Sequence, residues 1–127
     1  MRLDAAGWPK LLAVLPDLVP GGRATVAFVA SEDFASKSGA AWLWRPGGAS
    51  RHPESQAYTG GVAPDWGMLL VVSGSALDAL CANGHFCTAA LVRRGEIRPF
   101  LLRDAASLEA AGLGDFIDSL GLAFPKH

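Results

Sequence analysis

Two stretches with apolar side chains on both sides of the backbone constrain the fold most strongly. In "RATVAFVA", residues 23–30, Val26 and Phe28 point to one side of a strand, and small apolar side chains point to the other. "MLLVV", residues 68–72, is apolar at every position. Strands of this kind are typical of the middle of a sheet, where both faces are covered. The sequence therefore predicts central strands at 23–30 and 68–72.

The remaining periodicity predicts further strands separated by helices. We expect strands at 40–45, 85–92 and 97–103, a helix after Asp4, a short helix starting at Ser73 or Ser75 and closed by 83–84, and a last helix capped by Asp104. This order predicts an α+β fold. Its sheet has about five strands and is largely antiparallel, and the N-terminal, short central and C-terminal helices pack mainly on one face.

Two details concern the end of the predicted sheet. "RRGE", residues 93–96, has the composition of a hairpin turn, with Gly95 at positive φ, between the strands expected at 85–92 and 97–103. Pro99 has no backbone N–H, so we expect its strand at a sheet edge or at a bulge.

Composition limits the classes of protein to consider. A chain of 127 residues fits a single α+β domain spanning residues 1–127. Half of the residues are apolar and only 18% are charged. Because this charge content is below the average of about 25% for soluble domains, we expect part of the surface to be covered in a homodimer.

The charge balance gives no sign of a polyanionic partner. The net charge is −1, so we expect no binding to nucleic acid. The apolar runs are shorter than the roughly 18 residues that span a bilayer, and Asp4, Lys10 and Asp17 interrupt the amino-terminal one. We therefore expect a cytoplasmic protein without a membrane partner.

"CANGHFC" holds both cysteines, Cys81 and Cys87, with His85 between them. A structural zinc site uses four ligands, usually as two closely spaced pairs, and the other histidines, His52 and His127, are isolated. The spacing is also not that of a redox-active pair. We expect two buried thiols, with no metal and no cofactor.

The best candidate for an anion site is "VVSGSALD", in which a buried strand leads through Ser73, Gly74 and Ser75 into a helix. Free amides at a helix start attract negative charge, and Gly74 allows close approach to the backbone. The alternative is an ordinary N-cap, in which Asp78 completes a capping box with Ser75.

"WLWR" places Trp42 and Trp44 on the same side of a strand. Their rings either pack under the first helix, cover a partner subunit or line a pocket. The long segment 47–67 that follows is rich in Gly, Pro and Ser, and segments of this length are often functional. With Arg45, it contributes the other candidate ligand contacts, which are Arg51, His52, Tyr58 and Trp66.

These residues lead to two main functional hypotheses. In the first, the protein is a binding or regulatory module that recognises a protein partner or a small anionic ligand through the tryptophan-bearing sheet face and the 47–67 segment. In the alternative, it is a small hydrolase or transferase that uses Ser75 or Cys87 as nucleophile and His85 or His52 as base. A purely structural protein is a third class.

Overall fold

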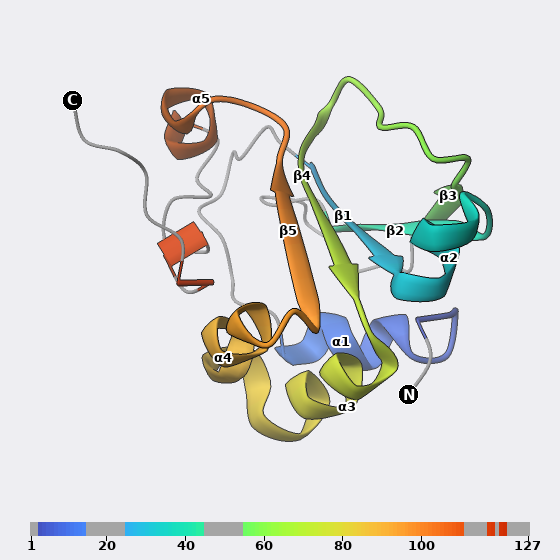
Figure 1. Ribbon diagram of the computed structural model, residues 1–127, viewed down its shortest axis with the longest axis vertical. Helices are drawn as coiled ribbons and strands as arrows, with labels where there is room; N and C mark the ends of the chain where they lie inside the picture. The colour runs from blue at the N-terminus through green and yellow to red at the C-terminus, as the bar shows by residue number, and fades with distance from the viewer. Residues whose placement is uncertain (1–2, 15–24, 45–54, 111–116, 119, 122–127) are drawn as a thin grey trace.

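The computed structural model describes residues 3–14, 25–44, 55–110, 117–118 and 120–121, without the side chains of 12, 85, 86 and 105. Its five-stranded sheet has the order β3-β2-β1-β4-β5 (Figure 1). The strands are β1 (Thr25–Ala30), β2 (Ala40–Trp44), β3 (Ser55–Ala57), β4 (Trp66–Val72) and β5 (Ile97–Leu101). All neighbours pair antiparallel except β1 and β4, which are parallel. The predicted α+β class with a largely antiparallel sheet is confirmed.

Helices lie before the first strand, after the last one, and in the connections from β1 to β2 and from β4 to β5. They are α1 (Trp8–Val14), α2 (Ser31–Ser36), α3 (Gly74–Asn83), the 3₁₀-helix η1 (Gly84–Cys87), α4 (Thr88–Arg93) and α5 (Ala105–Ala110). Figure 1 shows α1, α3 and α4 gathered where β4 ends and β5 begins, and α2 on the other side of β4. None of the helices described is long and apolar enough to cross a membrane.

The central strands are buried on both faces, as their sequences predict. Every residue of β1 and β4 is buried. On one face, Val26 and Phe28 join Met68, Leu70 and the helices α1, α3 and α4 in what we call the helix-side core. On the other face lies the α2-side core, which consists of Ala27, Val29, Ala41, Leu43, Tyr58, Trp66, Leu69 and Val71, with Phe34, Ala63 and Leu102 packed against it.

The expected strand at 85–92 is wrong, and so is the expected hairpin at 93–96. The chain forms η1 and then α4, and residues 93–96 connect α4 to β5. Thr88 and Leu91 are the buried residues of α4. Their spacing of three is that of a helix face, and the two alanines between them favour a helix. Gly95 nevertheless has positive φ, at 76°.

The segment 47–67 contains more regular structure than expected. Residues 55–57 form β3, which pairs with β2, and β4 begins at Trp66. Ser55, Gln56 and Ala57 are all exposed, so no alternation of apolar side chains marks this strand. Its pairing rests on backbone hydrogen bonds to β2, which composition does not reveal.

Helix ends follow the expected capping chemistry at four places. The Asp4 carboxylate accepts hydrogen bonds from the N–H groups of residues 6 and 7, just before α1. Ser73 caps α3, Asp104 accepts from the Ser107 N–H at α5, and Gly84 closes α3 at a φ of 73°. At α2, by contrast, Ala30 occupies the N-cap position and no side chain caps the helix, which starts with Ser31.

Pro99 lies in β5, at the edge of the sheet, as predicted. Two hydrogen bonds show which residues of β5 direct their backbone groups toward β4. The Ser73 N–H donates to the Glu96 carbonyl, and the Leu102 N–H donates to the Gly67 carbonyl. Even-numbered residues of β5 therefore face β4, while residues 97, 99 and 101 direct their backbone groups away from the sheet. The missing N–H of Pro99 falls at a position where β4 requires none.

Candidate binding surface between α2 and β5

Three aromatic rings form a row on the α2-side face of the sheet. The centroid of the Phe34 ring lies 6.4 Å from that of Tyr58, with 24° between the ring planes. The centroids of the Phe34 and Phe100 rings are 5.5 Å apart, with 29° between the ring planes. Exposure increases along this aromatic row, from 3% at Tyr58 through the half-buried Phe34 to 39% at Phe100. The row therefore leads from the core to the surface.

The register of β5 explains why Phe100 and Arg98 share this face. Phe100 pairs with Leu69 and Arg98 pairs with Val71, and both partners belong to the α2-side core. Side chains two residues apart point to the same face of a strand. Phe34 reaches the same place from α2, which begins directly after β1. A short helix and an edge strand, more than 60 residues apart in the sequence, thus build the surface together.

The Arg98 guanidinium rests on the aromatic row. Its central carbon lies 5.1 Å from the centroid of the Phe34 ring, which is a cation–π geometry. Arg98 is exposed and forms no ion pair with any residue that the structure describes. The nearby helix α2 carries Asp33, but this carboxylate accepts a hydrogen bond from the Ala40 N–H instead. The N–H groups of Arg98 are therefore available to an external acceptor.

The structure separates the predicted aromatic site residues onto opposite faces. Tyr58 and Trp66 belong to the α2-side core. Trp42 and Trp44, only 8% and 7% exposed, belong to the helix-side core, where the Trp42 ring lies 6.1 Å from that of Trp8 on α1. Packing under the first helix was one of three expected roles, and in this position the two indoles offer little area to a ligand. The prediction that they contact a ligand stays untested.

Three other predicted site residues, Arg45, Arg51 and His52, lie outside the described residues, as does the side chain of His85. The histidines proposed as catalytic bases therefore have no position relative to Ser75 or Cys87.

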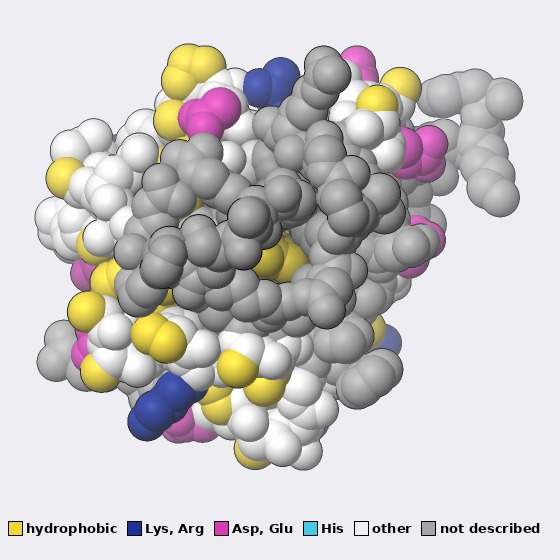
Figure 2. All heavy atoms as spheres, turned by 180° about the vertical axis from the view of Figure 1, so that it is seen from behind, with side chains coloured by type: hydrophobic (Ala, Val, Ile, Leu, Met, Phe, Trp, Pro, Cys, Tyr) yellow, Lys and Arg dark blue, Asp and Glu magenta, His cyan; other side chains and the backbone are white. Residues whose placement is uncertain are grey.

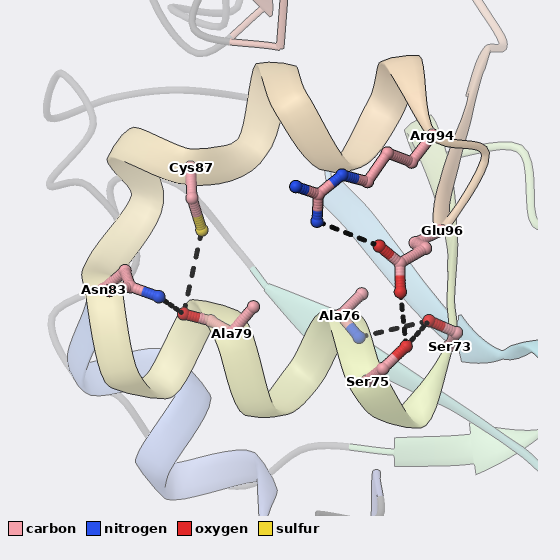
Figure 3. Close-up of polar contacts among 8 residues, drawn as sticks. All are labelled: Ser73, Ser75, Ala76, Ala79, Asn83, Cys87, Arg94 and Glu96. Carbon is pink, nitrogen blue, oxygen red and sulfur yellow. Dashed lines mark hydrogen bonds and ion pairs between the residues drawn. The ribbon is translucent and has the colours of Figure 1, made fainter.

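The Ser73–Gly74–Ser75 turn holds a carboxylate from the protein itself (Figure 3). The Ser73 hydroxyl accepts a hydrogen bond from the Ala76 N–H at 3.1 Å, and the Ser75 hydroxyl donates one to Glu96. Arg94 lies 3.7 Å from the other oxygen of Glu96. A negative charge near a helix start is favourable, and Glu96 already supplies it here. Ser73, and not Ser75, is the cap, so the capping box expected between Ser75 and Asp78 is not the one that starts α3.

Both cysteines are half-buried thiols that form no disulfide. The Cys87 thiol donates to the carbonyl oxygen of Gly84 at 3.3 Å. It also donates to that of Ala79 at 3.7 Å, which ties η1 to α3 (Figure 3). Burial, followed by the charge of Asp78, raises the pKa of the Cys81 thiol, although Lys10 opposes this. A raised pKa lowers the thiolate fraction and with it the reactivity. Among the described residues, no group of three or more His, Cys, Asp or Glu could hold a metal ion.

Sequence reasoning missed Phe34, Arg98 and Phe100. One signal was present, because Arg98 and Phe100 alternate around Pro99 in "IRPFL" and must share a face if the segment is a strand. The part played by Phe34 had no comparable signal, since "SEDFASKSG" reads as a polar connection.

Charges elsewhere are dispersed. On the face seen in Figure 2, the charged side chains of the described residues stand singly or in small groups among hydrophobic ones. No basic stripe crosses the described part of this face.

No protein-family model and no curated protein matches the sequence. Two solved structures show weak likeness. One is a double mutant of the sec-alkyl sulfatase PisA1, with 16% identity, a TM-score of 0.45, and coverage of 75% of this chain and 14% of that one. The other is the stereoselective inverting sec-alkylsulfatase Pisa1 from Pseudomonas sp., with 16% identity, a TM-score of 0.39, and coverage of 87% and 15%. The chain spans about a seventh of their length, and likeness at this level carries no conclusion about fold or activity.

Proposed function

We propose that this protein is a binding module that recognises a small anionic ligand at Arg98, with Phe34 and Phe100 as the apolar part of the site. The observation that carries the proposal is the Arg98 guanidinium, seated on the Phe34 ring with no ion-pair partner among the described residues. An arginine held by an aromatic ring loses less side-chain entropy when it binds a carboxylate or phosphate. Its planar fork is suited to two parallel hydrogen bonds with such a group.

The geometry supports binding better than catalysis. The aromatic row and Arg98 provide apolar area and a fixed positive charge, which bind and orient a ligand. A catalytic site also needs a nucleophile or a general base within hydrogen-bonding reach. The proposed nucleophiles are engaged elsewhere, Ser75 with Glu96 and Cys87 with the carbonyl groups of α3 and its end.

A titration followed by two-dimensional NMR tests the anion site. Cyclohexanecarboxylate is the probe, and its neutral amide, cyclohexanecarboxamide, has nearly the same shape without the charge. We expect the carboxylate to give saturable shifts at the Arg98 side chain and along α2 and β5, and the amide to bind at least about tenfold more weakly, as for a lost charge-assisted hydrogen bond.

Arg94 offers a matched control. Its side chain is 70% exposed and lies 3.7 Å from the Glu96 carboxylate. Arg98→Gln is expected to weaken carboxylate binding at least about tenfold, and Arg94→Gln to leave it unchanged. Equal effects of the two substitutions, or equal binding of acid and amide, would refute a site at Arg98.

A thiol-labelling experiment separates this function from the hydrolase or transferase alternative. In the folded protein we expect slow alkylation of Cys81, because burial raises its pKa, and of Cys87, because its thiol is hydrogen-bonded inside the η1 turn. Both should react fully in denaturant. Fast, pH-dependent labelling of one cysteine in the native state would favour a nucleophile.

We also propose that the chain acts as a homodimer in the cytoplasm. The low charge content supports the dimer, together with the exposed apolar side chain of Val62, which is not part of the Arg98 site. Light scattering over a dilution series measures the molar mass, and a constant monomer mass at all concentrations would contradict the dimer.

A further inference from the structure

We infer that the ligand of the Arg98 site is a planar aromatic anion, in which a flat ring carries a carboxylate or phosphate group. This rests on the proposed function and adds the shape of the ligand. It follows from the geometry of the aromatic row, taken together with the position of Arg98 on the same strand.

The aromatic row is an incomplete stack. The plane of the Phe34 ring is tilted by only 24° from that of Tyr58 and by 29° from that of Phe100, so that each neighbouring pair is stacked. Tyr58 is buried and Phe34 half-buried, whereas Phe100 keeps 39% of its surface exposed. A flat ring placed on the exposed part of Phe100 would extend the row by one more ring. Offset-stacked rings attract each other beyond the burial of their area.

Arg98 is placed to receive a charged substituent on that ring. It lies two residues before Phe100 on the same face of β5, which corresponds to about 6.6 Å along the strand. Its guanidinium already stands over Phe34, the next ring of the row. We therefore expect the Arg98 side chain to reach a charged group at the edge of a ring that stacks on Phe100. The ring of such a ligand would stack on Phe100 while its anionic group binds Arg98.

An extended peptide added to the edge of β5 is a weaker occupant. Of the three residues that direct backbone groups outward, only Ile97 and Leu101 have an N–H to offer, because the middle one is Pro99. An added strand would lose a hydrogen bond at its centre. Recognition through the face of the sheet, by stacking and by charge, requires no backbone pairing.

Benzoate and cyclohexanecarboxylate test the shape of the ligand, because they share charge and size but only benzoate is planar. We expect benzoate to bind more tightly by roughly two- to tenfold. It should also shift the Phe100 ring protons upfield through its ring current. Phe100→Leu keeps an apolar side chain and is expected to remove the preference. Leu101→Ala is the matched control, since Leu101 is similarly exposed but its side chain points to the opposite face of β5.

The outcomes distinguish the two proposals. If both carboxylates bind at Arg98 with equal affinity, the planar-ring inference is overturned and the anion-binding function stands. If neither shifts the Arg98 resonances up to its solubility limit, the function fails and the inference fails with it. If the preference for benzoate survives in Phe100→Leu, stacking on Phe100 is not its cause.

Discussion

The guanidinium carbon of Arg98 lies 5.1 Å from the centre of the Phe34 ring, and this contact joins an edge strand to a helix that follows a central strand. We predict a measurable coupling between the two side chains. In a double-mutant cycle of Arg98→Gln and Phe34→Leu, urea unfolding should give an interaction free energy of about 0.5–1 kcal/mol, as for exposed cation–π pairs. Additive effects would show that the pair contributes nothing to stability.

Ser73 caps α3, and we predict that Ser73→Ala lowers the free energy of unfolding by about 1 kcal/mol, because the Ala76 N–H loses its acceptor. Ser73→Gly should cost only a few tenths of a kcal/mol, since glycine is tolerated at this position. Chemical denaturation measures both variants. If the two cost the same, the hydroxyl is not the source of the stabilisation.

Trp8 is fully buried, and its indole N–H has no hydrogen-bond partner among the residues that the structure describes. We predict that Trp8→Phe is tolerated far better than a large-to-small change. It removes the unpaired donor, which relieves about 1–3 kcal/mol, but also part of the ring that packs on Phe28. The net change should stay within about 1 kcal/mol of zero, against a loss of about 3–5 kcal/mol for Trp8→Ala. Thermal or urea unfolding compares the two variants, and a loss of similar size in both would contradict this account.

Alanine substitutions at Gly39 and Gly95 distinguish the cost of backbone strain from the cost of steric overlap. Both have positive φ, at 94° and 76°, but a Cβ on Gly39 would overlap the Asp33 carboxylate, whereas a Cβ on Gly95 meets no atom within 4 Å. Gly95→Ala should lower the free energy of unfolding by about 1–2 kcal/mol through strain alone. Gly39→Ala should cost more, because Asp33 must also release the Ala40 N–H. The reverse ranking in denaturant unfolding would contradict this.

Asp104 makes stability depend on pH at the start of α5. The hydrogen bond from the Ser107 N–H, followed by that from the Ser107 side chain, holds the pKa of this carboxyl below its usual range. A pKa that is lower in the folded state favours folding above the unfolded pKa of about 3.9, and this contribution disappears as the pH falls through the folded pKa.

Asp104→Asn is the variant that isolates this effect, because asparagine also caps helices but does not titrate there. Between about pH 6 and about pH 2, the wild-type protein should lose more stability than the variant. Carbon-13 titration of the Asp104 carboxyl reports the pKa directly, and a value at or above that of a model peptide would contradict the prediction.

Local sequence chemistry determined the central strands, the edge strand and several helix ends of this protein. Strands that are apolar on both faces had to lie at the centre of a sheet, and Pro99 had to lie where no N–H is needed. Ser73, Gly84 and Asp104 marked helix ends correctly, because capping depends on residues only a few positions away. Signals of such short range can be read without knowledge of the fold.

Tertiary structure decided the rest, because those choices depend on partners distant in the sequence. Residues 85–92 suited a strand by composition, yet Thr88 and Leu91 are buried on a helix that packs beside β5. Trp42 packs beside Trp8 of α1 and Trp44 beside Phe28 of β1, so that both indoles belong to the helix-side core. The contact of Phe34 with Arg98 and Phe100 exists only because the sheet order places β5 beside β4, on the face that α2 covers. Because these residues are far apart in the sequence, the site follows from the packing of the sheet and no local sequence pattern predicts it.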